Sequence, residues 1–214
     1  MRLYLSSYRV PTPIQLEALV GRPFSKMRLT LIPNAKDYKQ QNEYQVSMQE
    51  THDYFEFLGG TRFSTMDLRK HNSASSIMEA LDGTDLLWVC GGNSFLLRYQ
   101  MQRSGFDDAL PGIMDSPIVY GGESAGAIVM GDSLKGIELC DDPRAAPEII
   151  WEGLGVAGGM IVPHADNADF GPCIERISEL YRPDQQIILN DNQALLVTTT
   201  SRVIVTAEAT ATIL

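Results

Sequence analysis

Residues 117–131 predict a strand, a sharp turn and a helix in immediate succession, and this order restricts the fold more than any other segment. The run Ile118–Tyr120 is β-branched and aromatic and follows a proline, which is typical of a buried strand. Gly-Glu-Ser-Ala-Gly at 122–126 comes next, before an apolar, helix-like run. Glycines two positions on either side of Ser124 permit the tight turn of a nucleophile elbow, in which helix N–H groups face a developing oxyanion. The alternative is a glycine-rich turn without a catalytic role.

Strand-like and helix-like patterns alternate along the rest of the chain, which predicts an α/β fold with a largely parallel sheet and helices on both faces. Residues 186–214 alternate apolar and polar residues and predict antiparallel strands or hairpins at a sheet edge. No repeat or linker is evident, so residues 1–214 are expected to form one domain. The other predicted strands are 2–6, 27–32, 63–68, 85–90 and 158–162, and the predicted helices are 12–20, 38–58, 75–81, 94–103 and 172–180.

The charge and the cysteines exclude several classes of protein. The net charge is −10 and no run of Lys or Arg occurs, so neither nucleic acid nor an anionic membrane is an expected partner. The opening strand is too short for a signal sequence, and no segment reaches the roughly 18 apolar residues of a membrane span. The three cysteines have no metal-ligand spacing, and their odd number argues against a disulfide framework. These features predict a cytoplasmic protein without a metal or cofactor.

A nucleophilic serine needs a base to take its proton, and His164 is the candidate. His164 follows the predicted strand that ends at Val162 and Pro163, and so lies at the carboxyl edge of the sheet, where open α/β folds collect catalytic groups. His52 and His71 lie in polar segments and are expected to be solvated. A purely structural histidine is the alternative for His164.

The acid that orients the base has four candidates. Asp191 follows the apolar run 187–190, and Asp166 lies two residues after the histidine. Asp141 or Asp142 would give the order Ser, acid, His that is found in α/β-hydrolases, whereas Asp191 gives Ser, His, acid. Loop aspartates commonly serve as turn formers or caps, so the sequence leaves this choice open.

Gly91-Gly92-Asn93 directly follows the buried run 85–90. Two glycines there permit close approach of backbone or substrate, and N–H groups at a helix start can hold an anion. A tight turn between strand and helix is the simpler interpretation. No nucleotide-binding glycine motif is present.

Three motifs taken together, at 89–97, 122–127 and 163–164, resemble the peptidase E family of serine peptidases. That family shares its α/β architecture with class I glutamine amidotransferases, so the resemblance implies a flavodoxin-like fold. It also implies a Ser-His-acid hydrolase in which Ser124 attacks the carbonyl, His164 is the base and Asp191 is the acid. The implied oxyanion hole consists of the Ala125 N–H group and a glycine N–H group from Gly91 or Gly92.

The resemblance implies substrates that are dipeptides or short peptides with an N-terminal aspartate. An arginine early in the helix after the histidine is thought to meet the acidic side chain, and Cys173 occupies that position here, with Arg176 one turn further on. Asn93 and Glu123, which lie within the motifs, are further expected substrate contacts. The prediction is a serine peptidase, monomer or homodimer. The alternatives are an esterase or amidohydrolase of broader specificity and a non-catalytic domain that binds a small molecule.

Overall fold

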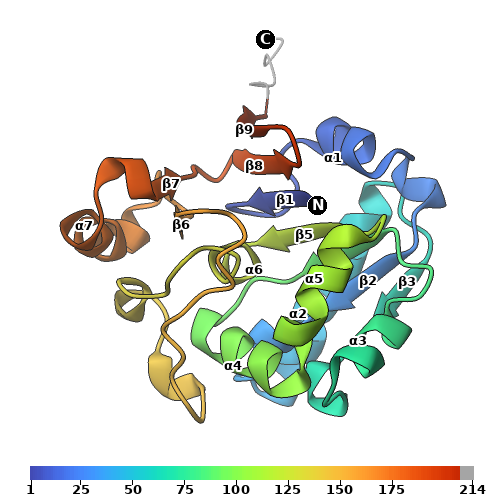
Figure 1. Cartoon of the computed structure of the whole chain (residues 1–214), viewed down its shortest axis with the longest axis horizontal. Coiled ribbons are helices and arrows are strands. Elements are labelled where there is room, and N and C mark those ends of the chain that lie inside the picture. The colour runs from blue at the N-terminus through green and yellow to red at the C-terminus, as the bar shows by residue number, and fades with distance from the viewer. Residues whose placement is uncertain (208–214) are drawn as a thin grey trace.

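Five parallel strands form the centre of the structure, a computed structural model in which residues 1–207 are described. The main sheet has the strand order β3-β2-β4-β5-β1-β8-β9, and only β8 and β9 run antiparallel to their neighbours (Figure 1). The mostly parallel sheet and the antiparallel strands near the C-terminus confirm the predicted fold class. The strands of this sheet are β1 (Arg2–Ser6), β2 (Leu29–Ile32), β3 (Phe63–Thr65), β4 (Leu86–Val89), β5 (Val119–Glu123), β8 (Gln193–Thr198) and β9 (Arg202–Thr206).

Helices cover both faces of the sheet because its strands carry apolar side chains on both sides. One core contains side chains of α1 (Pro13–Val20) and α2 (Gln41–Phe57), including Leu16 and Phe55. The core on the opposite face contains side chains of the remaining helices of this sheet, which are α3 (Ala74–Ala80), α4 (Ser94–Ser104), α5 (Phe106–Asp115) and α6 (Ala125–Ile128). No helix within residues 1–207 is both long enough and apolar enough to cross a bilayer.

Helix α5 was not predicted, although its signal is present in the sequence. Its buried residues have the helical spacing of an amphipathic helix, whereas Pro111 faces solvent within it. The proline removes one backbone donor and so obscures a pattern that packing against α3 and α4 nevertheless stabilises. The buried residues of α5 are Phe106, Ala109, Leu110 and Ile113.

Two short strands form a second sheet, and this corrects one prediction. Strand β7 (Gln186–Ile188) was expected to be antiparallel but pairs in parallel with β6 (Met160–Val162). Helix α7 (Gly171–Leu180) connects them and lies beside them at the edge of the molecule in Figure 1. The last seven residues of the predicted C-terminal strand region, 208–214, lie outside the described residues.

The cysteines also differ from the prediction, because Cys140 and Cys173 form a disulfide with their Cα atoms 6.0 Å apart. This distance is within the usual range for such bonds. The odd cysteine, Cys90, is buried as a thiol at the end of β4. Disulfides are rare in the cytosol, so the bond removes one argument for a cytoplasmic location, which stays a prediction.

Breaking the Cys140–Cys173 bond is expected to lower the free energy of unfolding by about 3–4 kcal/mol, because the bond constrains the unfolded chain across a loop. The two cysteines are separated by 33 residues along the sequence. Urea unfolding with and without a reducing agent measures the difference. In the Cys140→Ser/Cys173→Ser double variant the reducing agent should have no further effect. Equal midpoints for the native protein under both conditions would show that the bond contributes nothing.

Candidate active site

Ser124 lies at the carboxyl end of β5, at the N-terminus of α6, in a backbone conformation that is rare for a residue with a side chain. Its φ is 49° and its ψ is −111°. Glycine is required on both sides because the chain passes so close to itself. A Cβ atom at Gly122 would lie 2.4 Å from the Gly126 carbonyl oxygen, and one at Gly126 would lie 2.3 Å from the Val89 carbonyl oxygen. The two glycines of the motif thus permit the turn that presents Ser124 at the edge of the sheet.

Parallel pairing of β6 and β7 places His164 beside Asp191. The register aligns Val162 with Ile188, and the two loops that follow run together, since the Ala165 N–H group donates to the Leu189 carbonyl. His164 and Asp191 therefore reach the same sheet edge as Ser124, although they come from the smaller sheet.

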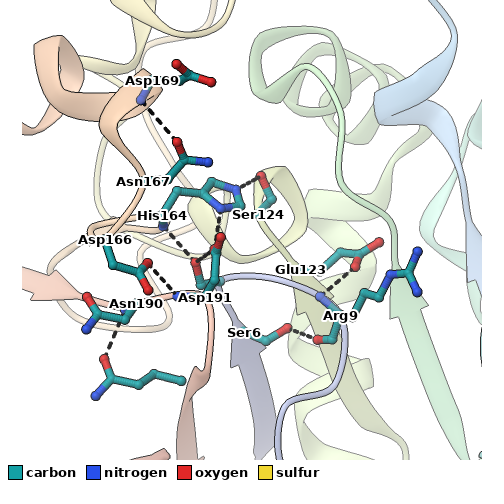
Figure 2. A network of polar contacts seen from close by, with 12 residues as sticks. Ser6, Arg9, Glu123, Ser124, His164, Asp166, Asn167, Asp169, Asn190 and Asp191 are labelled. Atoms are coloured by element: carbon teal, nitrogen blue, oxygen red, sulfur yellow. Dashed lines mark hydrogen bonds and ion pairs between the residues drawn. The ribbon is translucent and has the colours of Figure 1, made fainter.

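Figure 2 shows the His164 ring between the Ser124 hydroxyl and the Asp191 carboxylate. His164 Nε2 is 3.0 Å from Ser124 Oγ, and His164 Nδ1 is 2.5 Å from Asp191 Oδ1. With the ring proton on Nδ1 donated to the carboxylate, Nε2 has a lone pair that can accept the serine proton. The arrangement has the geometry of a nucleophile, a base and an orienting acid.

The other candidate acids have different partners. Asp166 Oδ1 accepts the Asp191 N–H group at 2.9 Å, so this side chain orients the loop that carries Asp191 (Figure 2). Asp141 accepts the Ser94 N–H group, and the exposed Asp142 pairs with Arg144. Among the four candidates, only Asp191 contacts His164.

Ser7 holds the histidine and the acid in place, and this residue was not singled out from the sequence. The buried Ser7 hydroxyl donates to Asp191 Oδ1 at 2.8 Å and accepts the His164 N–H group at 2.7 Å. The His164 ring also packs on Phe170, with ring centroids 4.3 Å apart. The only available signal was the position of Ser7 directly after a buried strand, at the sheet edge where the other site residues gather.

Among the backbone N–H groups near Ser124, those of Gly92, Ala125 and Gly126 have no hydrogen-bond acceptor among the described residues. At Gly92 φ is 147°, and a Cβ atom would lie 2.3 Å from the Ala35 carbonyl oxygen, so only glycine fits this turn. The Gly91 N–H group, by contrast, is already bonded to Glu123 Oε1 at 3.3 Å. Of the two glycines, only Gly92 therefore has an N–H group without a partner among the described residues.

Glu123 and Asn93, both expected to contact substrate, form hydrogen bonds within the protein. The second Glu123 oxygen accepts the Arg9 N–H group at 2.9 Å (Figure 2). Because its first oxygen bonds to Gly91, one carboxylate connects the loops that follow β1 and β4. Asn93 caps α4 by accepting the Leu96 N–H group, and its amide nitrogen donates to the Asp142 carbonyl. Glu123 still faces a cavity beside Ser124, whereas both ends of the Asn93 side chain are committed to the fold.

Ser124 lies in the wall of two cavities of different character. The larger, about 290 Å³, includes the cationic side chains of Arg9, Lys36 and Lys39. The smaller, about 210 Å³, has mostly apolar walls and includes Cys173. Arg176 lines neither cavity and pairs with Glu179 at 3.0 Å. Of the two residues on α7 that were expected to contact substrate, only Cys173 lines a cavity beside Ser124.

Relatives of the chain are peptidases or are described as such. An uncharacterised peptidase of Listeria innocua is 27% identical over 127 residues, which are 58% of this chain and 61% of that protein. Peptidase E of Streptomyces coelicolor is 32% identical over 106 residues, which are 50% of this chain and 42% of that protein. The matched segments thus span less than two thirds of these relatives.

Solved structures share the fold over nearly the whole chain. A crystal structure of a candidate peptidase E from Listeria monocytogenes EGD-e superposes with a TM-score of 0.79 at 22% identity, covering 96% of this chain and 98% of the other. A peptidase from an acI-B1 actinobacterium gives a TM-score of 0.65 at 16% identity, covering 96% and 87%.

A family model covers Ser124, His164 and Asp191 in one match. The model of peptidase family S51 matches residues 8–205, a range that includes Ser124, His164 and Asp191. This match confirms the resemblance to peptidase E that the three motifs indicate. The chain belongs to peptidase family S51.

Proposed function

We propose that the chain is a serine peptidase that hydrolyses dipeptides or short peptides through an acyl-enzyme. One observation carries the proposal, namely the continuous hydrogen-bonded series from Ser124 Oγ through the His164 ring to Asp191 Oδ1, with distances of 3.0 and 2.5 Å. Monomer or homodimer and a cytoplasmic location remain parts of the proposal.

In the first half of the reaction, His164 Nε2 takes the proton as Ser124 Oγ attacks the scissile carbonyl. The carbonyl oxygen becomes an anion and accepts hydrogen bonds from the Gly92 and Ala125 N–H groups. His164 then gives its proton to the leaving amine, and the peptide bond breaks. Asp191 holds the imidazole in the required tautomer and stabilises its charged form.

In the second half, water enters the position of the leaving amine and gives a proton to His164 Nε2. The resulting hydroxide attacks the ester carbon, and the acyl group leaves Ser124 as a carboxylic acid while the serine recovers its proton. Ser7 fixes the positions of both His164 and Asp191 throughout, because its hydroxyl bonds to each of them.

A fluorophosphonate probe tests the proposal directly, since it reacts with activated serines. The expected result is a single adduct per chain, located on Ser124 by peptide mapping and absent from heat-denatured protein. An unlabelled native protein would favour the alternative of a non-catalytic binding domain. A dipeptide cleavage assay that measures released amino acids distinguishes a peptidase from an esterase. An esterase would hydrolyse p-nitrophenyl acetate but not the dipeptides.

A further inference from the structure

We propose that the smaller cavity beside Ser124 binds the N-terminal residue of the peptide when that residue has an uncharged, apolar side chain, and that Asp141 receives its ammonium group. This proposal rests on the proposed peptidase function and specifies its substrate class. It differs from the N-terminal aspartate that the resemblance to peptidase E implies.

The walls of the cavity are apolar around a volume of about 210 Å³, a size that suits one side chain rather than a larger ligand. The cavity includes Ser124 and Gly92, so its occupant lies directly beside the reacting hydroxyl and the oxyanion donor. Burying an apolar side chain here removes its surface from water without leaving polar groups unpaired. The apolar walls are formed by Ile128, Ile137, Val162, Pro163, Phe170 and Ile177.

No cation lines this cavity among the described residues. Cys173, at the start of α7, is bonded to Cys140 and therefore carries no charge. Arg176 is one turn further on and pairs with Glu179 outside the cavity. An aspartate side chain would lose its hydration there and gain no positive partner, so the cavity should reject it.

Asp141 is the charged group in the wall, and it has one oxygen available. Its Oδ2 atom accepts the Ser94 N–H group at 2.7 Å, whereas Oδ1 accepts no hydrogen bond from a described residue. Burial raises the pKa of Asp141, and the hydrogen bond from the Ser94 N–H group opposes this effect only in part. An ammonium group at Oδ1 would supply the missing donor and the compensating charge, whereas a second carboxylate would be repelled.

This placement also orients the scissile bond. The first carbonyl of a peptide is two bonds from its N-terminal nitrogen, so an ammonium at Asp141 leaves that carbonyl near Ser124 and Gly92. The remainder of the peptide then occupies the larger cavity. Three cationic side chains line that cavity, Arg9, Lys36 and Lys39, against two carboxylates, Glu50 and Glu123. This excess of positive charge suits the C-terminal carboxylate of a dipeptide.

Four peptides test the proposal on the native protein, namely Leu-Ala, Ala-Ala, Asp-Ala and Nα-acetyl-Leu-Ala. We expect kcat/KM for Leu-Ala to exceed that for Ala-Ala by about tenfold or more, because the larger side chain fills the cavity. Asp-Ala and the acetylated peptide should be cleaved more slowly still. Preference for Asp-Ala, or equal cleavage of the acetylated and unacetylated peptides, would overturn the proposal.

Substitutions in the wall of the smaller cavity test whether this cavity determines the preference for the N-terminal residue. Asp141→Asn keeps the shape of the side chain and should raise KM for Leu-Ala about 10–100-fold, with a smaller change for the acetylated peptide. Cys173→Arg and Cys173→Ser both break the disulfide, but only arginine adds a cation. The ratio of Asp-Ala to Leu-Ala cleavage should therefore rise about tenfold or more in the arginine variant relative to the serine variant. Equal ratios in the two variants would show that this wall does not select the side chain.

Probe labelling separates the failure of this proposal from the failure of the peptidase function. If Ser124 reacts with the fluorophosphonate but the four peptides are cleaved at equal rates, only the specificity proposal is overturned. If Ser124 does not react, the peptidase function is overturned and the specificity proposal with it.

Discussion

Ser124→Ala is expected to lower kcat/KM for the best peptide substrate by about 10⁵-fold or more while leaving the fold intact. The variant removes the only hydroxyl within hydrogen-bonding distance of His164 Nε2 among the described residues, so no acyl-enzyme can form. The oxyanion donors remain, and a small residual rate above that in water should persist. Single-turnover hydrolysis of Leu-Ala with enzyme in excess measures so large a loss.

Two controls test whether the Ser124→Ala variant loses activity because it unfolds, namely its unfolding midpoint and a second serine variant. Serine and alanine both carry a Cβ atom, so alanine at this position faces the same strain at a φ of 49° and should change the unfolding midpoint little. Ser178→Ala serves as the matched control, because the Ser178 hydroxyl is exposed and bonds only to the Ile174 carbonyl of its own helix. Full activity of the Ser124 variant would show that the catalytic centre lies elsewhere.

Asp191→Asn should lower kcat by about 10⁴-fold with little change in the folded structure. The Asp191 carboxylate accepts the proton on His164 Nδ1, and an amide can present an N–H group there instead, which favours the wrong tautomer. Nε2 would then carry the proton and could not act as the base. The KM should change far less than kcat, because Asp191 lines neither cavity beside Ser124.

Asp142→Asn is the matched control among the four candidate acids. The Asp142 side chain is exposed and pairs with Arg144, and its substitution should alter kcat less than about twofold. If the Asp142 variant lost activity and the Asp191 variant kept it, the acid would be misassigned.

Much of the main sheet could be predicted because each of its parallel strands carries its own local signal. The predicted strand 2–6 coincides with β1, and the predicted strand 85–90 contains β4. The predicted ends of strands were wrong where a side chain caps a turn and so ends the strand early. The predicted strand 63–68 ends at Thr65, and the Asp67 side chain caps a short 3₁₀ turn over Leu68–Lys70. The partner of β7 could not be predicted, since pairing across 26 residues has no local signature.

The candidate site was predictable to the extent that its members follow strands. Ser124, His164 and Asp191 each stand at a carboxyl strand end, and parallel strands bring such ends to one edge. Contacts that join distant segments were not predictable. The Ser7 hydroxyl meets residues more than 150 positions away, and the Cys140–Cys173 bond depends on how the loop after α6 packs against α7.

The division of the site between two sheets has a mechanical consequence. The proposed base follows β6 of the small sheet, and the proposed acid lies in the loop between β7 and β8, whereas the proposed nucleophile and oxyanion donors follow strands of the main sheet. A displacement of the small sheet would lengthen the gap between the His164 ring and the Ser124 hydroxyl, and it would also break the hydrogen bond from the His164 N–H group to Ser7. Ser7, at the end of β1, bonds to both His164 and Asp191 and so joins these two residues to the main sheet. The proposed catalytic geometry thus depends on the small sheet keeping its position against the end of β1.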